Sequence, residues 1–376
     1  MKKNKKRYLI ENDLVVGGGA EQIMRLLVSK LLAEGHDVTV ATCSGSKKMF
    51  YDNYPREVKH FLWEVPWCGN VRRFSLAWMR YRVRRMQVAM QRWILDHRRY
   101  DVAIAMKEGP CMRDVANRNV RKRYGWVHVD YRSLYWTKGT YSSAEEEMAF
   151  FRKMDNVICV SQAAADGVKL VVGDPGNLLV AHNPIDIDAI KAKSYYPCEV
   201  MRMEGKPLLV AVGRLVEGKR FDLLLEACAC LSGRYDFEVW IVGEGDQRDA
   251  LERMIAEAHF DFVKLLGHKD NPYPYIKQAD WFVSTSVSES YGLAIQEALI
   301  LGVPVVVTEC PAMYETVEEK YGYIIDNNVE ALVVTLEEIL TNHAFALAKR
   351  AGAQEYSDKF ESLSVRLNRI YQIVNS

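Results

Sequence analysis

Short apolar runs rich in β-branched residues alternate with amphipathic segments along nearly the whole chain. Such runs are typical of strands buried on both faces, and the segments between them, such as Glu21–Glu34 and Phe221–Leu231, have the apolar spacing of helices. Strands that alternate with helices form parallel sheets with helices on both faces. The sequence therefore predicts an α/β fold. The expected strands are Arg7–Glu11, Val38–Thr42, Val102–Met106, Arg123–Val127, Asn156–Val160, Leu178–Val180, Leu208–Val212, Phe237–Val242, Val263–Leu266, Trp281–Thr285, Val303–Thr308 and Tyr323–Ile325.

The alternation pauses between Asp186 and Lys206, where proline, glycine and tyrosine residues favour turns. A chain of 376 residues is long enough to form two cores. We therefore predict one Rossmann-like domain over residues 1–190 and a second over residues 205–358. The last segment, about residues 360–376, has the apolar spacing of a further helix.

Bulk properties narrow the range of partners and compartments. The formal net charge is +1, and no DNA- or RNA-binding motif is present, so we expect no nucleic-acid partner. No apolar run approaches the roughly 20 residues that span a bilayer, and the N-terminus lacks the features of a signal peptide. None of the eight cysteines forms a Cys-x-x-Cys pair, which favours reduced thiols. These features predict a cytoplasmic protein.

The first candidate site is the glycine-rich segment Gly17–Glu21, between the first predicted strand and the first predicted helix. Glycine lets the backbone approach a phosphate or a sugar closely, and a helix N-terminus favours negative charge. Gly18 and Gly19 are therefore candidate ligand-binding residues. The segment lacks the Gly-x-Gly-x-x-Gly spacing of a dinucleotide site, and a tight turn without a ligand is the alternative.

A second candidate site is the loop Gly213–Lys219, directly after the first strand of the second half. Ligands of open α/β sheets bind at the carboxyl ends of the strands, where Arg214 and Lys219 are expected. A planar guanidinium and a compact ammonium suit a diphosphate, whose charge has to be neutralised. A solvated loop with two unrelated cations is the alternative.

Two carboxylates eight positions apart, Glu289 and Glu297, mark the third candidate site. Glu289 is expected in the turn after a strand, and Glu297 about one turn into the following helix. Each can accept hydrogen bonds from the paired hydroxyls of a ribose or a hexose. The amides at the start of this helix, those of Tyr291, Gly292 and Leu293, can receive a phosphate oxygen.

Together these segments resemble the retaining glycosyltransferases of the GT4 family, which have the GT-B fold. The resemblance runs from the first strand to about residue 325 and is strongest over residues 208–310. It implies two Rossmann-like domains that face each other across a cleft, with the C-terminal helix crossing back to the first domain. Residues 1–190 would then lie on the acceptor side, and residues 205–358 would bind the nucleotide-sugar donor.

The resemblance assigns roles to residues on the donor side. Arg214 and Lys219 would hold the nucleotide diphosphate, and Glu297 would hold the ribose hydroxyls. The segments Ile241–Asp246 and Leu265–His268 also match loops of the family, the second of them near the base. His268 is therefore a candidate for contact with the base.

Further residues are implied around the transferred sugar. Glu289 would face this sugar, with Gly18 and Gly19 closing over it from the other domain. His128 follows a predicted strand and matches a family histidine that faces the donor sugar. Asp130 is a hypothesis for acceptor activation, although aspartate after a strand more often caps a helix or a turn.

The resemblance implies transfer with retention of configuration, by front-side attack of the acceptor through an oxocarbenium-like state. The main work of the protein would be to position the reactants and to stabilise the departing diphosphate through Arg214, Lys219 and the helix amides. The chain has no Asp-x-Asp motif at the end of a predicted strand, so we expect neither a metal nor another cofactor. Tyr291 stands where the family often has phenylalanine, a change that leaves the following amides intact.

The segment Asn70–Arg99 carries nine arginines and a single acid in a long helical pattern. One stripe is expected to pack on the domain, namely Met79, Val83, Met86, Met90, Trp93 and Ile94. Aromatic residues among the arginines, such as Trp78 and Tyr81, suit an anionic membrane surface or a lipid-diphosphate acceptor. A helix with solvated arginines is the alternative.

The predicted function is a retaining hexosyltransferase that builds a cell-surface polysaccharide or glycolipid. The donor would be a UDP-hexose or a UDP-N-acetylhexosamine, and the acceptor a glycan or a polyprenyl-diphosphate-linked sugar. The protein would be cytoplasmic, with possible peripheral contact at the inner face of the cell membrane. The alternatives are a sugar-nucleotide epimerase and a non-catalytic partner subunit with the same fold.

Overall fold

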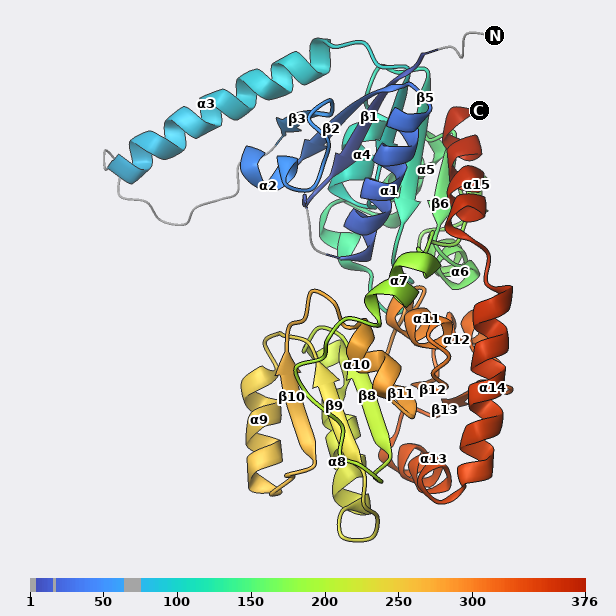
Figure 1. The fold of residues 1–376 in the computed structure, drawn as a ribbon. Coiled ribbons are helices and arrows are strands. Elements are labelled where there is room, and N and C mark those ends of the chain that lie inside the picture. The colour runs from blue at the N-terminus through green and yellow to red at the C-terminus, as the bar shows by residue number, and fades with distance from the viewer. Residues whose placement is uncertain (1–4, 16–17, 64–75) are drawn as a thin grey trace. The chain divides into compact units, whose positions relative to one another are not determined.

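The computed structural model describes residues 5–15, 18–63 and 76–376 (Figure 1). It divides into two compact units, one formed by residues 1–184 with 364–376 and the other by residues 185–363. Each unit contains one parallel sheet with helices packed on it (Figure 1). The predicted α/β fold with two parallel sheets is confirmed.

The first unit is built on a seven-stranded parallel sheet in the order β3-β2-β1-β4-β5-β6-β7. Its strands are β1 Arg7–Asn12, β2 Asp37–Thr42, β3 Lys59–Leu62, β4 Val102–Ala105, β5 Lys122–Val127, β6 Asn156–Cys159 and β7 Leu178–Val180. Its helices are α1 Gly19–Ala33, α2 Lys47–Tyr51, α3 Leu76–His97, α4 Pro110–Ala116, the 3-10 helix η1 Trp136–Gly139, α5 Ala144–Arg152, α6 Gln162–Val171 and α15 Leu363–Asn375. The central strands are fully buried, as their continuous apolar runs predict.

The second unit is built on a six-stranded parallel sheet in the order β10-β9-β8-β11-β12-β13. Its strands are β8 Leu208–Val212, β9 Glu238–Val242, β10 Val263–Gly267, β11 Trp281–Ser284, β12 Val305–Thr308 and β13 Gly322–Ile325. Its helices are α7 Ile187–Lys193, the 3-10 helix η2 Glu217–Lys219, α8 Phe221–Leu231, α9 Arg248–Glu257, α10 Tyr273–Gln278, α11 Leu293–Ile300, α12 Met313–Thr316, α13 Val329–Thr341 and α14 His343–Lys359. The strand order changes direction between β8 and β11, and open α/β sheets bind their ligands at the carboxyl ends of the strands beside such a point.

One strand of the first sheet, β3, is missing from the sequence-based prediction. It has only four residues, Lys59-His-Phe-Leu62, and two of them are polar. It lies at the edge of the sheet and pairs with β2 alone. An edge strand has a single neighbour and needs no continuous apolar run, so its sequence gives a weak signal.

The C-terminal helix α15 packs on the first unit, as expected. The hydroxyl of Tyr371 lies 3.0 Å from His36 Nε2, and the ammonium of Lys30 on α1 lies over the Tyr371 ring at 5.3 Å. Near the end of the helix, Tyr8 donates a hydrogen bond to Asn375 Oδ1 at 2.9 Å. These contacts join the two ends of the chain in one folding unit.

The prediction for the apolar stripe of the basic helix is wrong. The five residues of the stripe other than Ile94 are between 49% and 70% exposed on α3, namely Met79, Val83, Met86, Met90 and Trp93. The opposite face is buried instead, through Val88 and Leu95. Both faces carry apolar residues at helical spacing, so periodicity could not decide which of them packs on the domain. Residues 70–75 of the predicted segment lie outside the described residues.

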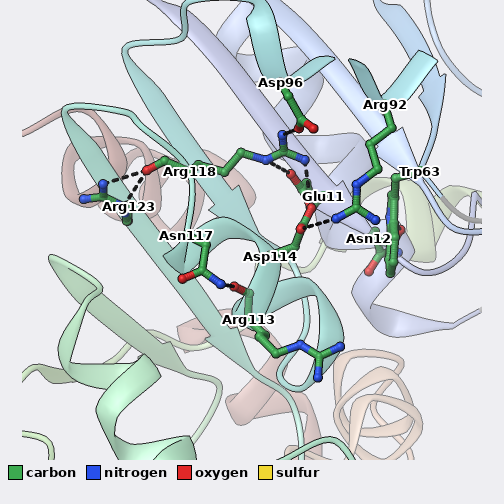
Figure 2. A network of polar contacts seen from close by, with 10 residues as sticks. All are labelled: Glu11, Asn12, Trp63, Arg92, Asp96, Arg113, Asp114, Asn117, Arg118 and Arg123. Carbon is green, nitrogen blue, oxygen red and sulfur yellow. Dashed lines mark hydrogen bonds and ion pairs between the residues drawn. The ribbon is translucent and has the colours of Figure 1, made fainter. Parts of the chain in front are cut away.

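A polar network attaches the C-terminal half of α3 to the sheet (Figure 2). The guanidinium of Arg118 donates to Glu11 Oε1 on β1 and to Asp114 Oδ2 on α4, each at 2.8 Å, and it also binds Asp96 of α3. Arg92 of α3 donates to Asp114 Oδ1 at 3.0 Å. The N-terminal half of α3 extends beyond the sheet (Figure 1).

No single helix in the described part of the chain combines the length and the apolar composition needed to cross a bilayer. One pair, α13 with residues 344–359 of α14, meets both criteria only when taken together, and its two members are bent by 99°.

Candidate functional site

The loop after β8 is held in place by the loop after β9. The amide of Leu215 donates to the Glu244 carbonyl at 2.8 Å, and the amide of Gln247 donates to the Leu215 carbonyl at 2.9 Å. The two loops touch so closely that a Cβ atom at Gly243 would lie 1.8 Å from the Gly213 carbonyl oxygen. Glycine is therefore required at position 243, and the backbone of the Gly213–Lys219 loop is fixed at the carboxyl edge of the sheet.

Lys219 and Glu289 meet in the second unit. The Lys219 ammonium forms an ion pair and a hydrogen bond with Glu289 Oε1. Ser286 Oγ donates to the same oxygen at 2.8 Å. The hydroxyl of Thr285 donates to the carbonyls of Lys219 and Arg220 at 2.9 and 2.7 Å, which ties the end of β11 to the loop after β8. The structure thus brings the second and third sequence motifs together.

The two predicted diphosphate ligands differ in their surroundings. Lys219 is partly buried and bound to a carboxylate, whereas the side chain of Arg214 is exposed. Arg214 takes part in none of the ion pairs between described residues. A guanidinium without a carboxylate partner can bind an anion without first breaking an ion pair.

The start of α11 lies directly after the Glu289 turn. Gly292 has a φ of 62°, and a Cβ atom there would lie 2.9 Å from Met313 Cε, so glycine suits both the conformation and the space. The Tyr291 side chain is buried, and its carbonyl accepts a hydrogen bond from Gln296 Nε2 at 2.8 Å. The amides that follow, beginning with Leu293, have no acceptor within the helix and can bind an anion.

Glu297 lies about one turn into α11. Burial raises the pKa of its carboxyl to about 7, although the hydrogen bond from Tyr273 opposes this effect. The Tyr273 hydroxyl donates to Glu297 Oε1 at 3.1 Å. Tyr273 was not among the predicted site residues, because its position on α10 beside α11 is set by packing alone. A partly protonated carboxyl with one occupied oxygen can both donate and accept hydrogen bonds at paired hydroxyls.

His268 follows β10, at the carboxyl edge of the same sheet. Its side chain is exposed, and Nε2 lies 3.2 Å from Asp270 Oδ1. The geometry gives this ring no fixed orientation toward Lys219 or Glu297. Contact between His268 and a base stays a prediction.

In the first unit, His128 follows β5 with its ring held from one side. The ring is hydrogen-bonded to the Met106 backbone, and Nε2 is buried without a hydrogen-bond partner. Burial, reinforced by the nearby Lys107 ammonium, lowers the pKa of His128 to about 4. The imidazole is therefore neutral near pH 7, and Nε2 presents a lone pair that can accept a proton or a hydroxyl hydrogen bond.

The glycine-rich segment begins α1, with Gly18 at the N-cap and Gly19 as the first helical residue. The Gly18 amide donates to Glu21 Oε2 at 2.7 Å, and Asn12 Nδ2 donates to Glu21 Oε1 at 3.0 Å. Glu21 therefore caps the helix from within and occupies the Gly18 amide. Gly17 lies outside the described residues.

Asp130 is occupied by structural partners. Arg132 donates to both of its carboxylate oxygens from the guanidinium and to Oδ1 from its backbone amide, at distances from 2.7 to 3.0 Å. The carboxylate is buried, and a Cβ atom at Gly167 would lie 2.2 Å from Oδ1. This arrangement favours the structural alternative over the hypothesis of acceptor activation.

Two sequence families cover most of the chain. Residues 17–189 match the family described as Glycosyltransferase Family 4, and residues 199–359 match the family described as Glycosyl transferases group 1. The chain belongs to the GT4 family. Its two parallel sheets and its C-terminal helix are those of the GT-B fold.

Two curated relatives of this GT4 chain are glycosyltransferases with different named roles. The chain is 28% identical over 206 residues to the lipopolysaccharide core biosynthesis glycosyltransferase LpsE of Rhizobium meliloti, which covers 52% of this chain and 57% of the relative. It is 25% identical over 274 residues to the poly(ribitol-phosphate) alpha-N-acetylglucosaminyltransferase of Staphylococcus aureus, which covers 71% of this chain and 53% of the relative. The chain thus spans about half the length of these relatives.

Among solved structures, Anabaena Alr3699/HepE in complex with UDP and glucose is similar to the GT4 chain over nearly its full length. The TM-score is 0.74 at 16% sequence identity, with 98% of this chain and 99% of the other covered. At this identity the likeness establishes the fold.

Predicted site residues lie in both units of the GT4 chain. The second unit brings Lys219, Glu289 and the start of α11 together, while the first places His128 at the carboxyl edge of its sheet. No group of three or more histidine, cysteine, aspartate or glutamate side chains in the described ranges is arranged to hold a metal ion.

Proposed function

We propose that this GT4 chain transfers a sugar, with retention of configuration, from a nucleotide-diphosphate donor to a glycan or polyprenyl-diphosphate-linked acceptor. The observation that carries the proposal is the meeting of Lys219 with Glu289 beside the open amides of α11. A cation and helix amides suit a diphosphate, and a carboxylate next to them suits the hydroxyls of the attached sugar.

In this proposal the donor rearranges the ion pair. The diphosphate takes the Lys219 ammonium, with Arg214 as a second cation, and Glu289 turns to the sugar hydroxyls. Glu297 binds the ribose. The bond between the anomeric carbon and the diphosphate oxygen breaks, the acceptor oxygen attacks on the same face, and the acceptor proton passes to the departing diphosphate. Arg214, Lys219 and the amides of α11 stabilise the charge that develops there.

The donor is proposed to be a UDP-hexose or a UDP-N-acetylhexosamine. Support comes from the similar structure with UDP and glucose and from the relative named as an N-acetylglucosaminyltransferase. The names of the relatives further support a place in the synthesis of a cell-envelope polysaccharide or glycolipid. We also propose that the protein works on the cytoplasmic side of the membrane.

A thermal-shift panel of nucleotide sugars tests the donor site. A ligand at about 100 times its Kd stabilises the folded state by about 2.7 kcal/mol. We expect one UDP-sugar to raise the melting temperature, and the Arg214→Ala and Glu297→Ala variants to lose most of this shift. If no nucleotide sugar stabilises the protein, or if both variants keep the full shift, the proposed site is wrong.

Product analysis with the stabilising donor separates the enzyme classes. Transfer to an acceptor supports the proposal. Conversion of the donor to its epimer without an acceptor would indicate an epimerase. Binding with neither reaction, under conditions in which a crude acceptor fraction is supplied, would indicate a non-catalytic partner subunit.

The proposal includes contact with an anionic membrane through α3. The exposed stripe that begins at Met79 and ends at Trp93 is flanked by arginines, among them Arg80, Arg84 and Arg85. Amphipathic helices with exposed apolar residues and arginines bind anionic lipid surfaces through both parts. Arg92 and Asp96, which attach α3 to the first unit, lie in its C-terminal half (Figure 2), and the stripe itself is exposed.

Liposome flotation tests this contact. We expect binding to vesicles of mixed neutral and anionic phospholipid, loss of binding without the anionic lipid, and weakening with added salt. The variant Met86→Ser/Met90→Ser should reduce binding, whereas Leu170→Ser, at an exposed leucine of α6, should not. Binding that does not depend on lipid charge or on salt would contradict the proposal. A dimer in solution that covers the stripe would also contradict it.

A further inference from the structure

One aromatic side chain at the carboxyl edge of the first sheet is both firmly held and exposed. Trp136 is the first residue of η1 and is 41% exposed. Its indole Nε1 donates a hydrogen bond of 2.8 Å to Glu108 Oε1. Glu108 follows β4 and is only 1% exposed, so the polar atom of the indole is satisfied on its buried side. What the ring presents to solvent is hydrocarbon.

The ring is also positioned by close packing. A Cβ atom at Gly109 would lie 2.9 Å from Trp136 Cη2 and 3.1 Å from Thr137 Cγ2, so glycine at this position lets the indole approach the backbone. Gly109 has a φ of 77°, which glycine adopts without strain. The ring therefore has a defined place on the backbone that starts α4.

A second buried carboxylate fixes the loop that carries the ring. Glu147 of α5 accepts three hydrogen bonds of 2.8 Å, from the hydroxyls of Tyr131, Tyr135 and Thr137. Glu147 is fully buried. Three hydroxyls from seven consecutive loop positions on one carboxylate hold the segment on either side of Trp136, so the indole needs little ordering when a ligand binds.

Glu108 links the indole to His128. While its Oε1 accepts from Trp136, its Oε2 accepts from the backbone amide of His128 at 3.0 Å. One buried carboxylate therefore orients the two residues on neighbouring segments. Both residues lie at the carboxyl edge of the sheet, but His128 Nε2 is buried, so the exposed indole is the surface that a ligand meets.

We propose that Trp136 is the stacking platform for the sugar ring of the acceptor. A pyranose has one face of C–H groups, which suits the exposed indole. The inference rests on the proposed function and narrows it, because the group nearest the reaction in the acceptor is then a sugar ring and not a bare lipid phosphate. Glu108 acts as a positioning residue.

Fluorine NMR of protein labelled with 5-fluorotryptophan tests the platform directly. The Trp136→Phe variant identifies the Trp136 resonance among the eight tryptophans. Methyl β-glycosides of glucose, galactose and N-acetylglucosamine are the probes, and glucitol, which has hydroxyls but no ring, is the control. We expect at least one glycoside to shift the Trp136 resonance saturably and glucitol to leave it in place. If no glycoside moves it, or if glucitol moves it equally, the proposal is overturned.

Kinetics with the glycoside that binds give a second measure. Trp136→Ala should raise the KM for the glycoside about tenfold and Trp136→Phe clearly less, while the donor KM stays unchanged. Leu134→Ala is the matched control, since Leu134 is exposed in the same loop. Glu108→Gln should raise the KM for the glycoside without abolishing turnover. Added donor should not restore this KM. An unchanged acceptor KM in Trp136→Ala overturns the proposal.

Failure of this inference is distinguishable from failure of the proposed function. The donor-induced thermal shift depends on residues of the second unit and is measured without any acceptor. If the donor shifts the melting temperature but no glycoside shifts the Trp136 resonance, the donor site is supported and the stacking platform is wrong.

Discussion

The ammonium of Lys219 is bound to the carboxylate of Glu289, although the two residues are 70 positions apart and follow two different strands, β8 and β11. Ser286 shares the bound oxygen, so the carboxylate has two donors before any ligand arrives. The pair gives Lys219 a fixed direction at the carboxyl edge of the sheet. It also means that an incoming diphosphate competes with Glu289 for the ammonium.

The competition predicts opposite effects for the two members of the pair. Lys219→Ala should weaken the binding of UDP by roughly ten- to a hundredfold, the effect of losing a hydrogen bond to a charged group. Glu289→Gln should strengthen UDP binding severalfold while it lowers the transfer rate. Titration calorimetry measures both affinities. Lys206→Ala is the control, because Lys206 lies before β8 and pairs with Asp236 instead. The proposed role of the pair would be contradicted if Lys219→Ala did not weaken UDP binding or if Glu289→Gln did not strengthen it.

Glu297 should make folding stability depend on pH. Its pKa is raised by burial from the ordinary 4.5 to about 7 in the folded protein, so the native state holds the proton over a range in which the unfolded state has released it. Stability from this group is therefore present below pH 4.5 and is lost as the pH rises toward 7. Glu297→Gln removes this loss, which amounts to at most about 3 kcal/mol.

Urea unfolding of the wild type and Glu297→Gln at pH 5 and pH 8 measures this difference. The advantage of the variant should grow with pH. Tyr273→Phe removes the hydrogen bond that opposes the raised pKa, and it should move the pH window upward. A stability difference that is the same at both pH values would show that Glu297 does not titrate in this range.

His60 should contribute to acid sensitivity in the opposite direction. It is buried beside Phe50, with Nε2 2.9 Å from Thr42 Oγ1, and burial lowers its pKa to about 4. Between pH 6.5 and 4 the unfolded state binds a proton that the native state does not, so stability falls as the pH falls through this range. His60→Gln should flatten the acid limb of the stability profile. The exposed His97→Gln serves as the control and should leave it unchanged.

Arg118 is predicted to be a main source of stability in the first unit. It is nearly buried, and its partner Glu11 is fully buried, so Arg118→Met leaves a carboxylate without its cation and should cost about 3 to 5 kcal/mol. The double variant Glu11→Leu/Arg118→Met should recover part of this loss. Arg92→Met, at a half-exposed member of the same network, should cost less than about 1 kcal/mol (Figure 2). Chemical unfolding measures all three, and equal losses for Arg118 and Arg92 would contradict this account.

Several elements could be predicted because their signals are local. The buried strands read as continuous apolar runs, α8 begins and ends at the predicted residues, and α11 follows the Glu289 turn as expected. The four-residue edge strand β3 could not be predicted, since an edge strand is defined by its neighbour and not by its own composition. The packed face of α3 also depended on its surroundings, because apolar residues occur on both sides of that helix.

The candidate site shows the same division. The motif residues Lys219, Glu289 and His128 could be selected from their position after predicted strands. Their partners could not, because Tyr273, Glu108 and Trp136 lie in no recognisable motif and gain their importance from contacts with residues distant in sequence.

The sequence by itself determined the parallel α/β architecture, the C-terminal helix and the segments that carry the chemistry, because apolar period, glycine position and charge are properties of short segments. Only the tertiary structure decided that Lys219 is bound by Glu289, that the Gly18 amide is taken by Glu21, and which face of α3 meets solvent. Hydrogen bonds and burial depend on contacts between segments that are distant in the sequence, and these contacts form only when the sheets bring the ends of their strands together.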